Sequence, residues 1–156
     1  MVVIVILGIL AATALPRYTD MQVRARIAKL NGAIGSVRAA TALAHAQCLV
    51  QATPCATNSA AESINMDGVA NVTAVNQYPT ADANGIVSAA GISTVNPADF
   101  TLVTTGGAAA GNTITIGVPG ATANTCQFIY TSATWNGGVN NVVVAPTISG
   151  VVATCN

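Results

Sequence analysis

The chain has 156 residues, enough for a single domain. It is 52% hydrophobic and only 6% charged, and its five basic and five acidic side chains cancel. This balance excludes a nucleic-acid binder that relies on a clustered cationic surface, and it excludes a disordered chain, which combines low hydrophobicity with high net charge.

The zero net charge conceals a segregation along the chain. Residues 1–16 carry no charge, residues 17–38 hold all five bases and one acid, and residues 39–156 hold the other four acids. With one histidine and five carboxylates, the chain offers few ionisable groups for chemistry. The sequence therefore predicts a protein that is not an enzyme and that needs no cofactor, metal or small-molecule substrate.

The first element is an unbroken apolar run over residues 1–15, MVVIVILGILAATAL. A helix of that length rises about 22 Å, less than the roughly 30 Å hydrocarbon core of a bilayer. The run is interpreted as a truncated membrane span, a signal-peptide core or a deeply buried helix. A signal peptide has a basic start and a cleavage site, and here the start has no base and helical periodicity continues beyond the run.

Residues 16–50 continue this helix as an amphipathic half. Apolar and small side chains recur at steps of three and four, which is one face of an α-helix. This face comprises Val23, Ile27, Leu30, Ile34, Val37, Thr41, Ala44 and Cys48. Arg17, Arg24 and Arg38 follow a second stripe, and Asp20 is spaced to pair with Arg24. One helix from Met1 to about Cys48 is near 70 Å long, so half of it must be covered by something outside the chain.

Two residues weaken the helix in its apolar half. Pro16 has no N–H and crowds the carbonyl of Ala12, at a cost of about 3 kcal/mol. Gly8 costs about 1 kcal/mol relative to alanine. The stretch between Gly8 and Pro16 is therefore predicted to kink, or to unwind under load.

Residues 51–156 are predicted to form a globular β head, because Pro, Gly, Asn and Thr become frequent after Val50. The expected strands are Val69–Val75, Phe100–Val103, Thr113–Val118, Gln127–Thr131, Val142–Val144 and Ile148–Ala153. Asp82 is expected to cap a short helix over Ala83–Ala90, before Gly91. The segment Trp135-Asn136-Gly137-Gly138 is typical of a hairpin turn. The aromatic residues of the head are expected in its core and sheets.

Four cysteines, Cys48, Cys55, Cys126 and Cys155, allow three pairings. Joining Cys48 to Cys55 and Cys126 to Cys155 is the simplest, since each bond then closes a local loop. A zinc site is the alternative, but no CxxC pair exists and His45 is the only histidine. Disulfides indicate an oxidising compartment outside the cytoplasm.

Three further motifs are interpreted as structural. Gly106–Thr113 superficially fits a phosphate-binding loop, but Asn112 stands where the lysine must be and a strand is expected to follow. His45 is interpreted as a packing or surface residue rather than a partner of a free thiolate. Asp67, Asp82 and Asp99 are too dispersed to indicate a calcium site.

The segment MVVIVILGILAATALPRY resembles the N-terminal helix of type IV pilins, whose mature chains begin with FTLIEL before such a run. The resemblance implies that about six residues precede Met1, including a glutamate that registers one subunit on the next; they bring the apolar run to about 21 residues, enough to span a bilayer. Cys126 and Cys155 match the family's C-terminal disulfide loop. Tyr78-Pro79-Thr80-Ala81, Gly85-Ile86 and Ala89-Ala90-Gly91-Ile92 resemble pilins of the mannose-sensitive haemagglutinin type.

The resemblance implies a lollipop, with a long helix on an antiparallel head of four or five strands. It implies a subunit that is stored in the inner membrane and extruded as a homopolymeric filament by an assembly ATPase, a prepilin peptidase, a platform protein and a secretin. The filament is expected at the cell surface. Its core is expected to contain Val2, Val3, Ile4, Val5, Ile6, Leu7, Ile9, Leu10 and Leu15, and the helix is expected to loosen between Gly8 and Pro16.

The bases form a predicted inter-subunit belt of Arg17, Arg24, Arg26 and Lys29, because a stem of charge +4 meets a head of charge −4. Membrane headgroups are the alternative partner of this belt. Other interpretations also stay open: a type II secretion pseudopilin, a minor pilin, and a membrane-anchored binding module or enzyme. Pseudopilins commonly lack the terminal disulfide, so Cys126 and Cys155 favour the pilus subunit. Tyr18 is the only aromatic residue before Tyr78, which argues against a conductive aromatic stack.

Overall fold

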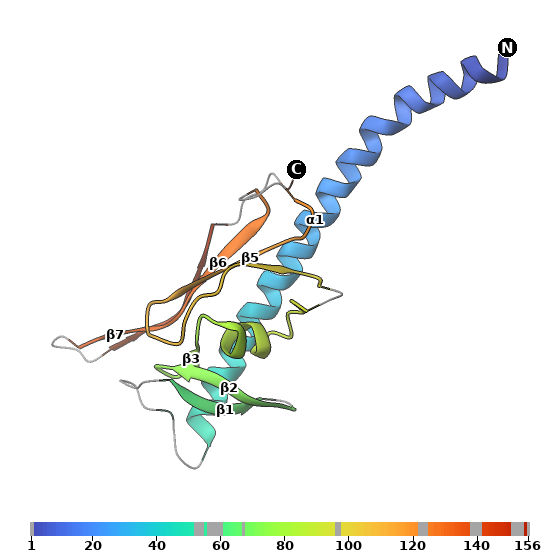
Figure 1. The fold of residues 1–156 in the computed structure, drawn as a ribbon. Coiled ribbons are helices and arrows are strands. Elements are labelled where there is room, and N and C mark those ends of the chain that lie inside the picture. The colour runs from blue at the N-terminus through green and yellow to red at the C-terminus, as the bar shows by residue number, and fades with distance from the viewer. Residues whose placement is uncertain are drawn as a thin grey trace.

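One long helix dominates the computed structural model, which describes residues 2–51, 55, 61–66, 68–95, 98–121, 125–137, 142–150 and 155. Helix α1 runs from Val2 to Val50 as the sequence predicts, and its 49 residues span about 73 Å. Its N-terminal part projects away from the remainder of the chain, which packs as a β-rich head against the C-terminal half (Figure 1). The architecture is therefore the predicted α+β lollipop, a long helical stem on a small antiparallel head.

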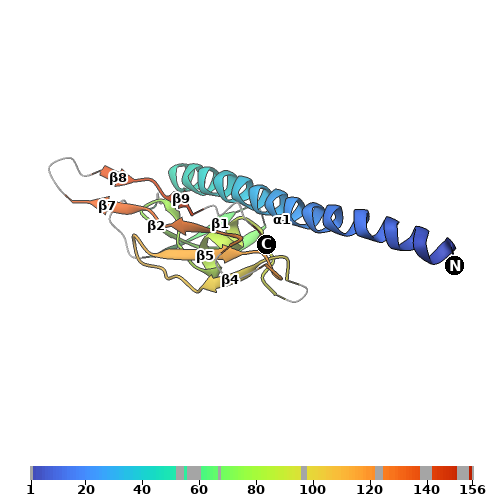
Figure 2. The same cartoon turned by 90° about the horizontal axis from the view of Figure 1, so that it is seen from above.

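Within the described residues, the strands of the head form three antiparallel sheets. The lower sheet has the order β1-β2-β3, with β1 at Glu62–Met66, β2 at Val69–Val75 and β3 at Tyr78–Pro79. The central sheet has the order β4-β5-β6-β9, with β4 at Thr101–Thr104, β5 at Thr113–Gly117, β6 at Gln127–Thr131 and β9 at Thr147–Ser149. A hairpin pairs β7 (Thr134–Asn136) with β8 (Val142–Val144). Figure 2 shows the sheets lying along one side of α1.

The predicted strands are found with small shifts. β2, β6 and β8 have the predicted bounds, while β4 and β5 are displaced or shortened by a residue. β9 begins one residue early, at Thr147, and ends at Ser149, so the strand predicted over Ile148–Ala153 does not continue at Gly150; residues 151–153 lie outside the described residues. Trp135 and Asn136, predicted to lie in the hairpin turn, belong to β7, and residues 138–141 lie outside the described residues. β1, β3 and β7 were not predicted.

The predicted apolar face of α1 is the face that the head covers. Leu30, Ile34 and Val37 are buried against the central sheet, where Phe128 and Tyr130 of β6 complete the core. Further along, Ala44 and Cys48 are buried in a second cluster beside the lower sheet. Val23, Ile27 and Thr41 are partly buried. The head therefore covers α1 from about Val23 onward. Every described side chain of α1 before Val23 is exposed.

Asp82 caps the short helix of the head, as predicted. Its carboxylate accepts a hydrogen bond from the backbone N–H of Gly85 at 2.6 Å and further ones from the hydroxyls of Thr73 and Thr80. The helix η1 covers Ala83–Val87 and is interrupted at Gly85. Gly91 follows with φ +63°, a value that favours glycine. The cap fixes the path of the chain from β3 back onto α1.

Candidate functional site

The main candidate site is the part of α1 that nothing in the chain covers. Eight of the nine residues predicted for a filament core, all except Leu15, are exposed by 52–72%. They are Val2, Val3, Ile4, Val5, Ile6, Leu7, Ile9 and Leu10. The side chain of Leu15 lies outside those that the structure describes. Large apolar side chains exposed on every side of a helix are unusual in a soluble monomer and mark a surface that another phase or molecule covers.

The one polar side chain of this segment is satisfied within the helix. The only polar side chain before Pro16 is that of Thr13, and its hydroxyl donates to the carbonyl of Leu10 at 3.1 Å, with that of Ile9 at 3.4 Å. Most backbone groups of a helix also bond internally, and the carbonyl of Ala12, opposite Pro16, is the exception within this segment. By length and composition α1 is able to cross a membrane, with a mean hydropathy of 1.9 over its most apolar 18 residues and none of that window buried in the head.

The helix is continuous through the stretch between Gly8 and Pro16 in the single subunit. A Cβ added at Gly8 would meet no other atom within 4 Å, so no neighbouring group in the described chain requires glycine there. Pro16 supplies no N–H to the carbonyl of Ala12, which leaves the helix short of one hydrogen bond. The loosening predicted for this stretch concerns the assembled filament and stays a prediction.

Two members of the predicted charge belt have partners in their own head. The Lys29 ammonium lies 2.9 Å from the Asp99 carboxylate and 5.0 Å from the centre of the Phe100 ring. The Arg26 guanidinium donates to the carbonyl of Cys155 at 3.3 Å. These contacts fasten the head to α1 where the free stem begins. The inter-subunit belt stays a prediction, and Arg26 and Lys29 already have partners within their own subunit.

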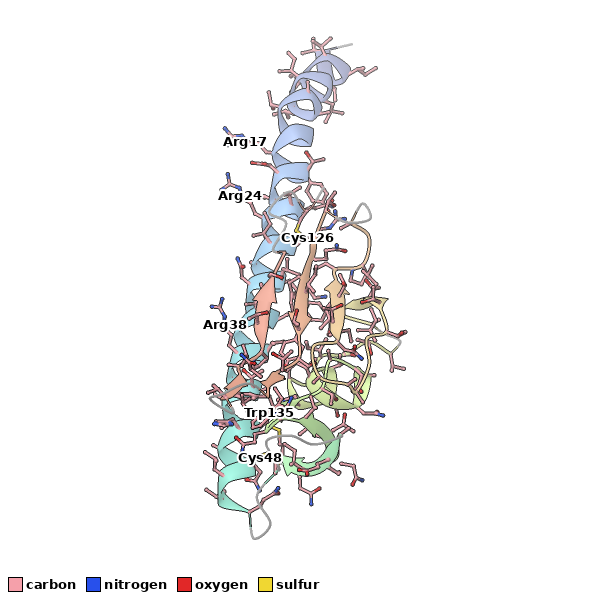
Figure 3. All side chains as sticks on the ribbon, turned by 90° about the vertical axis from the view of Figure 1, so that its left-hand side faces the viewer. Arg17, Arg24, Arg38, Cys48, Cys126 and Trp135 are labelled. Atoms are coloured by element: carbon pink, nitrogen blue, oxygen red, sulfur yellow. A yellow bond between two sulfur atoms is a disulfide. The ribbon has the colours of Figure 1, made fainter. Side chains whose placement is uncertain are left out.

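The remaining arginines project from α1 away from the sheets, as the labelled side chains of Figure 3 show. Arg17, Arg24 and Arg38 are exposed. Arg24 lies 3.5 Å from Asp20 in an exposed i,i+4 pair, an arrangement worth a few tenths of a kcal/mol. Arg38 shares the exposed stripe of Arg17 and Arg24 but is not a member of the predicted belt. Arg38 lies fourteen residues after Arg24, and this spacing places both arginines on nearly the same side of the helix.

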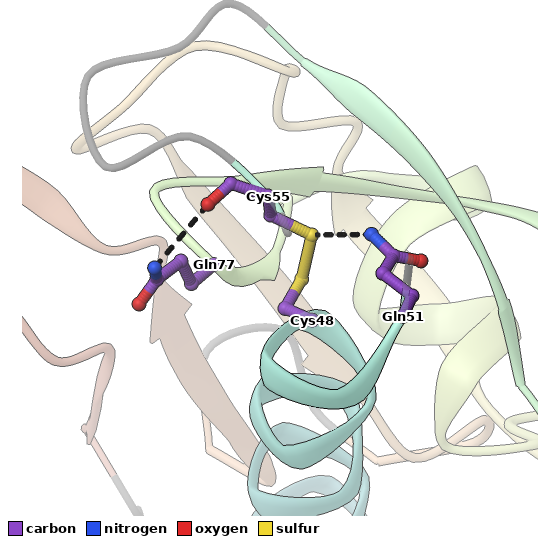
Figure 4. The surroundings of a disulfide bond; sticks show 4 residues. All are labelled: Cys48, Gln51, Cys55 and Gln77. Carbon is purple, nitrogen blue, oxygen red and sulfur yellow. Dashed lines mark hydrogen bonds between the residues drawn. A yellow bond between two sulfur atoms is a disulfide. The ribbon is translucent and has the colours of Figure 1, made fainter. Parts of the chain in front are cut away.

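Both ends of the head are closed by disulfides, with the local pairing that the spacing favoured. Cys48 bonds to Cys55 with a Cα–Cα distance of 5.1 Å, and Cys126 bonds to Cys155 at 4.4 Å. In Figure 4 the amide of Gln51 donates to the sulfur of Cys55, and the amide of Gln77 donates to the Cys55 carbonyl, each at 3.2 Å. All four sulfurs are therefore structural and none is a free thiolate.

His45, the glycine-rich segment and the described acidic residues of the head make contacts that belong to the fold. His45 stacks on Tyr78 with ring centroids 4.5 Å apart. The glycine-rich segment pairs Gly107 with Ala81 in an isolated bridge and leads into β5, a strand rather than the helix of a phosphate-binding loop. Within the described ranges no three His, Cys, Asp or Glu residues gather as for a metal ion, and Asp67 falls outside those ranges.

No family model, curated protein or solved structure compared with the chain matches it.

Proposed function

We propose that this chain is a structural subunit of a type IV pilus, a homopolymeric filament on the bacterial surface that serves adhesion, attachment or motility. The observation that carries the proposal is the segment from Val2 to Ala14, which is apolar, exposed on all sides and projects beyond the head. Such a helix surface is stable only when lipid or other helices surround it. A bilayer surrounds it before assembly, and copies of the same segment surround it afterwards.

The energetics favour an open polymer. Covering about fifteen apolar residues removes on the order of 1,000 Å² from water, a gross gain of about 25 kcal/mol before ordering costs. The segment and head of one copy contact different parts of the next, so the interface is heterologous. A heterologous contact that does not close into a ring propagates as a helical filament. In this scheme the inner membrane holds the subunit until the assembly ATPase, prepilin peptidase, platform protein and secretin act.

The Cys126–Cys155 bond favours a pilus subunit over a type II secretion pseudopilin, because pseudopilins commonly lack the terminal disulfide. A minor pilin has the same features and is separated from a major pilin by its abundance in the filament. A membrane-anchored enzyme or binding module would act as a monomer, which would leave the exposed segment with a membrane role alone.

Electron microscopy of material sheared from cells tests the proposal. Cells that express the chain with a pilus assembly system should carry thin filaments built from it, and Val5→Asn should abolish them by placing a polar amide in the core. Val103→Asn is the matched control, because Val103 is similarly exposed but lies on β4 of the head. Filaments from the Val5 variant at wild-type abundance, or a chain found only as a membrane-bound monomer, would contradict the proposal.

A further inference from the structure

The arginines that face away from the head begin where the apolar segment ends. Arg17 directly follows residues 1–16, which carry no charge. Arg24 lies seven residues further, about 10 Å along the axis and within about 20° of the same side. Arg17, Asp20, Met21 and Arg24 line one open depression of about 310 Å³ on the helix surface. The stem therefore presents two arginines at the level where a bilayer containing the segment gives way to water.

Tyr18 marks the same level independently. It is 63% exposed and is the first aromatic residue of the chain, next to the end of the apolar run. Tyrosine is enriched at membrane interfaces, where its ring meets acyl chains and its hydroxyl meets water. Long basic side chains next to the end of a span extend along the helix to the headgroups.

The end of the head that lies beside the free stem has few acidic side chains that would repel an anionic lipid surface. Residues 100–156 contain no acid. Asp99 is held by Lys29, and Arg26 bonds to the carbonyl of Cys155 at this end. Asp20 is the one acid within residues 1–38, and it faces Arg24.

From this placement we infer that Arg17 and Arg24, with Tyr18 between them, form a headgroup-binding band that recognises the phosphates of anionic lipids. The inference rests on the membrane-held stage of the proposed function and gives that stage a lipid preference. Arg38 lies about 21 Å beyond Arg24 along the axis, more than twice the Debye length at physiological salt, so it is outside the band.

A second copy of the chain is the competing partner for these arginines, and the described acids favour lipid. Asp82 accepts three hydrogen bonds, Asp99 pairs with Lys29, and Glu62 also interacts within its own chain. Each described acid of the head thus has a partner already, whereas lipid phosphates lie at the level of the band without any rearrangement of the head.

The test measures how the full chain divides between two vesicle populations. Protein in mild detergent is diluted into equal amounts of phosphatidylcholine vesicles and vesicles containing about 30% phosphatidylglycerol, which carry different labels, and the recovered ratio is the anionic preference. A base near an anionic surface contributes about fivefold. The wild-type chain should prefer anionic vesicles severalfold at about 0.15 M salt and lose most of the preference at about 0.5 M salt.

Three variants test whether the anionic preference comes from Arg17 and Arg24 or from positive charge anywhere on the helix. R17Q/R24Q should lower the preference by at least fivefold and leave recovery with neutral vesicles unchanged. R38Q removes a charge from the same side of the helix outside the band and should keep the wild-type ratio. Asp20→Asn removes the acid that faces Arg24, so it should raise the ratio.

The outcomes distinguish the inference from the function on which it rests. Equal recovery with both vesicles for the wild type, or equal losses in R17Q/R24Q and R38Q, would overturn the band and leave the filament proposal standing. If R17Q/R24Q partitions as wild type but no longer assembles, the arginines face a second copy and the lipid inference is wrong. No recovery with either vesicle would overturn the membrane-held stage and the band together.

Discussion

At the scale of single residues, Tyr130 joins the two larger sheets. Its side chain is fully buried, and its hydroxyl donates to the carbonyl of Pro79 in β3 at 2.8 Å. Tyr130→Phe leaves that carbonyl without its partner and should lower the free energy of unfolding by about 1–3 kcal/mol. Denaturant unfolding of the full chain in detergent measures the change. The exposed Tyr18, changed to Phe, is the control and should leave the midpoint unchanged; equal stability of both variants would contradict the prediction.

The same hydroxyl predicts a loss of stability at alkaline pH. Burial, and secondarily the nearby Tyr78, raise the pKa of Tyr130 far above its ordinary value. Below pH 10 both folded and unfolded chains keep this proton, so the hydroxyl adds no pH dependence. Above about pH 10 only the unfolded chain releases it, so the free energy of unfolding falls as the pH rises. The difference between wild type and Tyr130→Phe should therefore shrink between pH 9 and 11, and a constant difference would contradict this.

Thr80 leaves no room for a side chain at Gly85. A Cβ added there would meet both the side chain and the backbone of Thr80, which is fully buried. Gly85→Ala should therefore destabilise the head by about 1–3 kcal/mol. Gly35→Ala, on the exposed side of α1 where a Cβ meets nothing within 4 Å, should instead stabilise the chain by up to about 1 kcal/mol. Thermal unfolding of the two variants should give shifts of opposite sign; a Gly85 variant as stable as wild type would exclude the clash.

A residue-scale feature that the sequence did not reveal is the turn between β2 and β3. Asn76 and Gln77 both have positive φ, 51° and 71°, although neither is glycine. The Asn76 amide donates to the carbonyl of Ala133, and the Gln77 amide donates to that of Cys55. These partners are distant in sequence, and local turn rules, which favour glycine here, do not include them.

At the scale of elements, segments with a strong local sequence pattern were predicted correctly, and segments without one were missed. The covered face of α1 was predicted because steps of three and four set it, whatever packs on it. β1 was missed because its sequence, ESINM, is poor in strand-forming residues and becomes a strand by pairing with β2. β3 has only two residues, too few for a pattern.

The two disulfides should differ in their contribution to stability. Cys126 and Cys155 are separated by 29 positions, and Cys48 and Cys55 by seven. If the bonds act on the entropy of the unfolded chain, the first contributes about 3–4 kcal/mol and the second about 2 kcal/mol. Serine pairs at each site, compared by denaturant unfolding, should rank in that order. The Cys126–Cys155 bond also holds the carbonyl to which Arg26 donates, so the serine variant of this pair should lose further stability. The reverse ranking would mean that strain or residual structure outweighs loop length.

At the scale of the whole molecule, the sequence identified the exposed segment but not the division of the bases. An apolar run needs no knowledge of the fold, whereas the partners of Arg26 and Lys29 exist only once the head has folded. A rotation of 100° per residue already places Arg26 about 200° around the helix from Arg24. That angle separates the bases that contact the head of their own subunit from the bases that face outward.

The stretch from Gly8 to Pro16 gives the last prediction, which concerns the subunit within its filament. Pro16→Ala restores an N–H for the carbonyl of Ala12 and removes a penalty of about 3 kcal/mol, so it should keep the helix intact where the wild-type filament is predicted to loosen. Gly8→Ala removes only about 1 kcal/mol and serves as the graded control. Cryo-EM maps of the filaments should show continuous helical density at residues 8–16 in the Pro16 variant, and force spectroscopy should show less extension under load. Loosened density that is unchanged by Pro16→Ala would place its cause in packing between subunits rather than in the missing hydrogen bond.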